Sequence, residues 1–208
     1  MKNNNLVKQH KYYNNEFFAK WAKLYDLEKY ILFPLRKKAA RFLDLKPPKK
    51  IVDVATGTGA QAFEFAKIGH DVIGIDLSPE MLNQAKKKIP HGQFIQLSVL
   101  DLDKKFKENY FDYIFVIDAF HHFPEHKKVM KRFRAVLKYK GTLIITELDF
   151  GKVFNYLFHV LEPGNNWIYT KKAMKNIFKE SGFAIKKQKN IGIFSYVTIG
   201  LKGGVSNN

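Results

Sequence analysis

Short apolar runs alternate with stretches of helical spacing along most of this chain. The runs begin near residues 51, 72, 93, 112, 142, 184 and 195. Continuous runs of β-branched and apolar residues are typical of strands that are covered on both faces. Because strand and helix alternate, we expect an α/β fold with a doubly wound, mostly parallel sheet of seven strands and helices on both faces.

The last two runs predict the direction of the final strand. Phe183–Lys189 and Phe194–Leu201 are separated only by a short turn around Gly192. A connection of that length can only form a hairpin, since parallel neighbours need a long crossover. We therefore expect an antiparallel last strand.

The segment Ile51–Gln61, IVDVATGTGAQ, combines a buried strand, a tight turn and a helix. Asp53 lies near the end of the strand, and Gly57 and Gly59 allow a sharp turn and close approach of a ligand to the backbone. Residues Ala60–Ile68 have helical spacing, so the free N–H groups of the first turn face the glycine turn. The segment therefore predicts a site for a polar ligand.

This motif alone leaves two classes of cofactor open. Gly57 to Ala62 also fits the G-x-G-x-x-G/A pattern of dinucleotide-binding proteins. Asp76 closes the second apolar strand, where a carboxylate can accept hydrogen bonds from both hydroxyls of a ribose. Both classes require such an acid, so the choice depends on the next two strands.

Those strands complete a recognisable order of motifs. The segment Gln93–Leu102 predicts a third strand followed by Asp101, and Phe111–Phe123 predicts a fourth strand that runs into a loop. Together with the glycine turn, the acids in this order resemble the class I S-adenosylmethionine (SAM)-dependent methyltransferases. The DVATGTG sequence and the paired histidines are most similar to the group of ubiquinone/menaquinone, small-molecule and phospholipid N-methyltransferases. The resemblance is firm over residues 49–148.

The resemblance implies a Rossmann-like domain with SAM as cofactor and S-adenosylhomocysteine (SAH) as product. Asp53 and the backbone of Ala55, Gly57 and Gly59 would hold the methionine part of SAM. Asp76 would bind the ribose hydroxyls.

The other cofactor residues implied by the resemblance follow the later strands. Asp101 would accept a hydrogen bond from the adenine amino group, with Leu77 and Leu102 beside the ring. Ile117 and Asp118 would line the side of the methyl donor.

Two departures from the family pattern stand out. Ala55 occupies the position of a usual glycine, a change that is common in the quinone-methylating group. Tyr139 and Lys140 stand where the family often has proline and glycine. We expect neither departure to alter the family resemblance.

Aromatic segments at two places predict covers over the site. In the resembled families an N-terminal arm folds over the SAM pocket, so the resemblance implies that residues 1–44 form a helical arm that covers the active site, with Trp21 and Tyr25 contacting substrate. The second wall follows the fifth strand and carries Phe158 and Trp167. Their aromatic density favours an apolar or lipid-like acceptor, although plain packing of these rings on the sheet remains an alternative. Residues 45–201 would form the SAM-binding domain and 202–208 a flexible tail.

Methyl transfer from a sulfonium is an in-line displacement, so alignment and desolvation can suffice without a base. If a base is used, His121 and His122 are the candidates, because they follow the fourth strand and histidine titrates near neutral pH. The alternative is a structural loop histidine. A metal site that includes His126 is disfavoured, because adjacent residues diverge and no cluster of carboxylates completes the set.

The composition of the chain bears on which kinds of molecule it binds. The net charge is +17, but only four of the 36 basic residues are arginine, which fits either compositional drift or contact with anionic lipid or RNA. The fourth strand ends in Ile117–Phe120 and lacks the Asn/Asp-Pro-Pro-aromatic motif of enzymes that methylate base amines, so nucleic acid is disfavoured. The chain has no cysteine and no long apolar run, and we expect a cytoplasmic enzyme. An RNA or protein methyltransferase and a non-catalytic SAM- or NAD-binding module remain the alternatives, and the oligomeric state is open.

Overall fold

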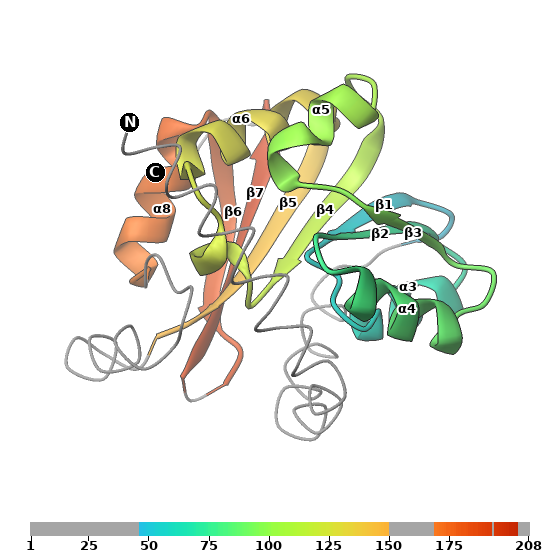
Figure 1. The fold of residues 1–208 in the computed structure, drawn as a ribbon. Coiled ribbons are helices and arrows are strands. Elements are labelled where there is room, and N and C mark those ends of the chain that lie inside the picture. The colour runs from blue at the N-terminus through green and yellow to red at the C-terminus, as the bar shows by residue number, and fades with distance from the viewer. Residues whose placement is uncertain (1–45, 150–168, 193, 204–208) are drawn as a thin grey trace, which may run out of the picture.

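The computed structural model describes residues 46–149, 169–192 and 194–203, which contain one sheet of seven strands (Figure 1). The strands are β1 (Lys50–Val54), β2 (Asp71–Asp76), β3 (Gln93–Gln96), β4 (Phe111–Ile117), β5 (Leu137–Leu148), β6 (Phe183–Asn190) and β7 (Ser195–Lys202). The helices are α3 (Ala60–Lys67), α4 (Pro79–Lys88), η1 (Val99–Asp101), α5 (Leu102–Lys105), η2 (Phe120–His122), α6 (His126–Val136) and α8 (Lys171–Glu180).

The strands lie in the order β3-β2-β1-β4-β5-β7-β6. The first five pair in parallel, whereas β7 is antiparallel to both β5 and β6. The predicted sheet and its antiparallel last strand are therefore confirmed. The chain moves outward from β1 to β3 and then returns to place β4 beside β1. Ligands of open α/β sheets bind at such a switch point, outside the carboxyl ends of the strands.

Both faces of the sheet are covered, and alternate residues of β4 show it. Ile114 packs in a core cluster with Phe133 of α6 and Phe178 of α8. Its neighbour Phe115 belongs to a second cluster, with Phe65 of α3. Because successive side chains of a strand point to opposite faces, α6 and α8 cover one face and α3 covers the other. The central strands are buried on both faces, which explains their continuous apolar sequences.

Two elements differ from the sequence prediction in detail. Helix α3 buries Ala62 and Phe65, but Phe63 is 42% exposed although it also fits the apolar spacing. The third strand has only four residues, and the chain then turns into the short helix η1, which ends at Asp101. The apolar run after Gln96 therefore belongs to a turn and not to the sheet.

Both departures from the family pattern retain a left-handed backbone. The φ angle is 54° at Ala55 and 60° at Lys140. Lys140 lies in an irregular stretch at the start of β5, where the register with β4 shifts between Phe111 and Tyr113. A side chain with a Cβ is strained at such angles by roughly 1–2 kcal/mol. The geometry that favours glycine has thus persisted where glycine itself has been replaced.

This strain predicts a stabilising substitution. Lys140→Gly should raise the free energy of unfolding by about 0.5–1 kcal/mol, because relief of the left-handed strain exceeds the entropy that glycine adds to the unfolded chain. Urea denaturation measures the change. Lys140→Ala is the matched control, since it removes the charge but keeps the Cβ, and it should give no gain. Equal stabilisation in both variants would instead attribute the effect to charge repulsion.

Candidate functional site

A pocket opens at the switch point, and its lining comes from the ends of β1, β2 and β4 and from the segments that follow the first four strands. The lining residues are Asp53, Val54, Ala55, Thr56, Gly57, Thr58, Ala60, Gln61, Ile75, Asp76, Leu77, Met81, Leu97, Val99, Ile117, Asp118, Ala119, His122 and Phe123. The pocket therefore joins the glycine turn to the loop after the fourth strand, as the order of motifs predicted.

The two glycines of the turn serve different purposes. Gly57 has a φ of 55°, and a Cβ built there would meet nothing within 4 Å, so its backbone angle is what requires glycine. Gly59 has a φ of 76°, and its Cβ would lie 2.9 Å from the Cβ of Ala85 in α4. Gly59 does not line the pocket. It allows α3 and α4 to pack closely, whereas Gly57 presents its backbone to the pocket.

Asp53 lies at the base of the turn and is 2% exposed. Its Oδ2 accepts a hydrogen bond of 2.6 Å from the hydroxyl of Thr56. The backbone N–H of Thr56 also donates to the carbonyl of Ile75 in β2, at 3.0 Å. A buried carboxylate needs such donors to offset its lost hydration, and this one faces the pocket as well.

Asp76 joins the ends of two strands. Its Oδ2 accepts from the backbone N–H of Gly57 at 2.8 Å, and its Oδ1 accepts from the N–H of Ser78 at 2.9 Å. Burial raises the pKa of Asp76, while these backbone hydrogen bonds lower it in part. Each carboxylate oxygen can accept a second hydrogen bond, so the group can still bind two hydroxyls from the pocket side.

Asp101 and Leu102, which were expected near adenine together with Leu77, do not line the pocket. The carboxylate of Asp101 forms a 2.7 Å ion pair with Lys104 at an exposed position, and Leu102 is fully buried in the core. Neither lines the pocket, whereas Leu97 and Val99 do. The third strand ends four residues after it begins, so the turn that follows, and not the acid at the end of η1, reaches the site. The placement thus gives no support to the predicted Asp101 contact.

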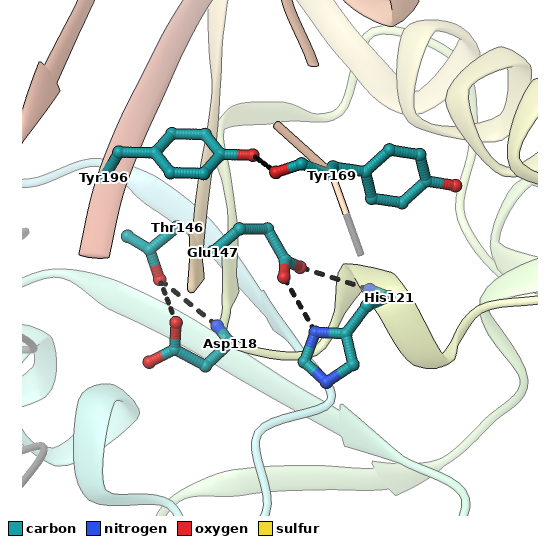
Figure 2. A network of polar contacts seen from close by, with 6 residues as sticks. All are labelled: Asp118, His121, Thr146, Glu147, Tyr169 and Tyr196. Carbon is teal, nitrogen blue, oxygen red and sulfur yellow. Dashed lines mark hydrogen bonds and ion pairs between the residues drawn. The ribbon is translucent and has the colours of Figure 1, made fainter. Parts of the chain in front are cut away.

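The far wall of the pocket follows β4 and includes Ile117 and Asp118, as expected. Asp118 has a φ of 48°, and its N–H donates to the carbonyl and the hydroxyl of Thr146, each at 3.1 Å. The Thr146 hydroxyl in turn donates to Oδ1 of Asp118 at 3.3 Å (Figure 2). These bonds to β5 hold Asp118 at the end of its strand.

The two candidate histidines occupy different environments. His122 lines the pocket, whereas His121 points to Glu147 at the end of β5 (Figure 2). Nδ1 of His121 lies 2.7 Å from Oε2 of Glu147, and the His121 backbone N–H donates to Oε1 at 3.1 Å. Both residues are at least 95% buried. A neutral His121 therefore carries its proton on Nδ1.

Sequence reasoning missed Glu147, although an acid at the end of an apolar strand was a detectable signal. The two hydrogen bonds between Glu147 and His121 hold η2 in place. The ring of His122 packs against that of His121, with 4.0 Å between the ring centroids, so these bonds also set the position of the pocket wall at His122. The alternative of a structural loop histidine thus fits His121, although its partner is a carboxylate rather than the backbone.

A second buried contact lies beside this pair. The hydroxyl of Tyr196 in β7 donates to the backbone carbonyl of Tyr169 at 2.6 Å (Figure 2). Burial, followed by the charge of Glu147, raises the pKa of both tyrosines far above its ordinary value, so both remain neutral. The ring of Tyr169 packs against Phe120 and His126, which attaches the chain entering α8 to the helices around the pocket.

Several predictions concern segments outside the described residues. They include the covering arm at 1–44 with Trp21 and Tyr25, and the second wall with Phe158 and Trp167. The described part of the chain contains no helix long and apolar enough to span a membrane. Within the same ranges no three metal-ligating side chains converge.

The central segment of the chain is similar to known proteins. Residues 52–145 match the family described as a methyltransferase domain. Over 138 residues the chain is 36% identical to a demethylmenaquinone methyltransferase of Thermotoga maritima, an alignment that covers 63% of this chain and 59% of that protein. It is 31% identical over 118 residues to the enzyme of the same name from Bacillus cereus, covering 54% and 50%. The chain thus spans about half to three fifths of the length of these relatives.

Solved structures share the fold at lower identity. A SAM-dependent methyltransferase from Aquifex aeolicus superposes with a TM-score of 0.70 at 21% identity, covering 86% of this chain and 96% of that one. A chain from the complex of the Haloferax volcanii Trm112 methyltransferase activator with its partner gives a TM-score of 0.83 at 16% identity, covering 91% and 99%. At these identities the likeness establishes the fold alone.

The burial of His126 among the aromatic rings beside the pocket predicts that the stability of the protein depends on pH. Burial lowers the pKa of His126 to about 4 from an ordinary value near 6.5. Between these values the unfolded chain binds a proton that the folded protein does not, so stability should fall as the pH falls from about 6.5 to about 4, by roughly 2–3 kcal/mol in all. Urea denaturation at several pH values measures this slope.

His126→Phe provides the control for that slope, because it keeps an aromatic ring against Phe120 and Tyr169 but cannot bind a proton. Its stability should vary less with pH in this window. Burial also lowers the pKa of His70, but His70 is present in both proteins and cancels in the difference. Parallel curves for the two proteins would contradict the assignment to His126.

Proposed function

We propose that this chain is a class I SAM-dependent methyltransferase that transfers the methyl group of SAM to a small acceptor, because residues 52–145 match a methyltransferase domain and the chain is similar to demethylmenaquinone methyltransferases. The observation that carries the proposal is a pair of carboxylates, the buried Asp53 and the half-buried Asp76, that flank one glycine turn and line one pocket. The activity is proposed from a domain that spans only part of its curated relatives.

The residues of the pocket suit SAM in chemistry as well as in order. Asp76 can accept two hydroxyl hydrogen bonds beyond those from Gly57 and Ser78. Leu97 and Val99 offer apolar surface for a flat ring, with Leu77 beside them. Asp53 lies at the other side of the turn, where it can accept from a cationic group. We assign the cofactor to these residues, and we leave Asp101 and Leu102 out of the assignment.

SAM supplies an activated methyl group on a sulfonium. The contribution of the chain is to hold the two reactants in line and to exclude water, which together lower the barrier without a base. Ile117, Asp118 and His122 form the wall on the side of the transferred group. Of the two histidines, His122 is the one that faces the pocket, so a proton acceptor, if the acceptor substrate needs one, would be His122 and not His121.

An apolar or lipid-like acceptor fits this wall best. Ala119 and Phe123 add apolar surface next to Ile117. The matched relatives are demethylmenaquinone methyltransferases, which supports a quinone precursor as the acceptor. A phospholipid amine is the other acceptor of this class. Incubation with labelled SAM and each acceptor in turn tests the proposal, and label in neither product would favour a binding module without transfer activity.

The cofactor assignment predicts the effect of one substitution. Asp76→Ala should weaken SAM and SAH binding by at least about tenfold, since hydrogen bonds to a charged group contribute about 1.5–3 kcal/mol. Calorimetric titration of the purified protein with SAM, SAH and NAD measures the change, and circular dichroism checks that the fold is intact.

Asp101→Ala serves as the matched control for this titration, because Asp101 is an acid of the same motif set that lies away from the pocket. It should bind SAM within about twofold of the unaltered protein, a difference well below one hydrogen bond. Normal SAM binding by Asp76→Ala would overturn the residue assignment. Binding of NAD without SAM would overturn the proposed reaction class.

A further inference from the structure

The side chain of Gln61 differs from the other polar groups around the pocket. It is 3% exposed and lines the pocket from the first turn of α3. Within the described ranges, neither its Oε1 nor its Nε2 has a hydrogen-bond partner. The carboxylates of Asp53 and Asp76, by contrast, are both bonded to donors within the protein. Gln61 therefore lacks the compensation that buried polar groups almost always have.

An unpartnered buried amide destabilises the ligand-free protein, so its persistence here requires an explanation. A leucine of similar size would pack at this position without that cost. The amide carries one acceptor and two donor hydrogens, and it faces a pocket. Its partner is therefore expected from the ligand, and the partner must both accept and donate hydrogen bonds.

The position of Gln61 identifies which part of a ligand it meets. Gln61 is the second residue of α3, two positions after Gly59 of the glycine turn, while the apolar residues Leu97 and Val99 come from the segment after β3. The first turn of α3 also carries the positive end of the helix dipole, which favours a negative group. An α-amino acid group satisfies both demands, since its carboxylate accepts and its ammonium donates.

We propose that Gln61 recognises the α-amino acid end of SAM, with Nε2 donating to the carboxylate and Oε1 accepting from the ammonium. This assignment rests on the proposed function. It makes Gln61 a specificity residue, because a ligand with the same adenosine but without the amino acid end leaves the amide unpartnered. It also separates SAM from a dinucleotide, whose pyrophosphate can only accept.

Two ligands and one substitution test the assignment. SAH and 5′-methylthioadenosine share the adenosine and the sulfur, but only SAH has the amino acid end. Gln61→Leu should weaken SAH binding by about tenfold and leave the affinity for 5′-methylthioadenosine within about twofold, as measured by calorimetry. The ligand-free Gln61→Leu protein should also melt at a higher temperature, because it no longer buries an unpartnered amide.

Gln188→Leu is the control for the melting experiment. The amide of Gln188 donates to the carbonyl of Lys171 at 2.9 Å and to the hydroxyl of Thr198 at 2.8 Å. Its loss should lower the melting temperature and leave both ligand affinities unchanged. Gln61→Glu adds a third comparison: it keeps the size but removes the donors and places a negative charge near the ligand carboxylate, so SAH binding should weaken more than in Gln61→Leu.

The outcomes separate this assignment from the proposed function. If the affinities for SAH and 5′-methylthioadenosine fall by the same factor in Gln61→Leu, or if its ligand-free melting temperature falls, Gln61 supports the structure and the assignment is wrong. If the unaltered protein binds neither SAM nor SAH, the proposed function fails and the assignment fails with it. Selective loss of SAH binding together with a higher melting temperature supports both.

Discussion

The carboxylate of Asp76 is the contact on which the geometry of the site depends. By accepting from Gly57 and from Ser78, it ties the turn after β1 to the start of α4. Strands β1 and β2 are parallel neighbours, with Asp53 opposite Gly74 in register, so their carboxyl ends lie at the same edge of the sheet. A turn with left-handed angles has few ways to hold its shape by itself, and this external acceptor selects one of them. Loss of the carboxylate would therefore remove a support of the turn as well as the proposed ribose contact.

At the end of β5, a second carboxylate holds a neighbouring loop in the same way. Glu147 is buried and holds η2 through two bonds to His121, just as Asp76 holds the glycine turn. A carboxylate taken out of water is costly unless donors surround it, so each such acid commits the neighbouring loop to one position. Both loops contribute residues to the pocket lining. In the proposed reaction, these rigid contacts to adjacent strands would set the relative position of the two reactants, as an in-line displacement requires.

The sequence predicted those parts of the fold that depend on local pattern. Continuous apolar runs located the central strands, and the short connection at Gly192 predicted the antiparallel β7. Placement was harder to predict where it depends on tertiary structure: Asp101 has the expected acidic character, but the chain leaves the sheet after four residues, and Asp101 pairs with Lys104 outside the lining of the pocket. Glu147 and Gln61 could not be assigned from spacing alone, because Glu147 gains its role from a histidine 26 positions earlier and Gln61 from the lack of a hydrogen-bond partner within residues 46–149, 169–192 and 194–203.

Helix α3 and the turn before it therefore contain two unfavourable features. Ala55 is held at a left-handed angle that alanine avoids, and Gln61 is buried without a hydrogen-bond partner among the described residues. Packing alone would select glycine at the first position and an apolar side chain at the second. Strain and unsatisfied polar groups concentrate at functional sites, where a ligand supplies the missing interaction. Since both residues line the same pocket, a ligand that fills it can supply the hydrogen bonds that Gln61 lacks and so stabilise the folded protein.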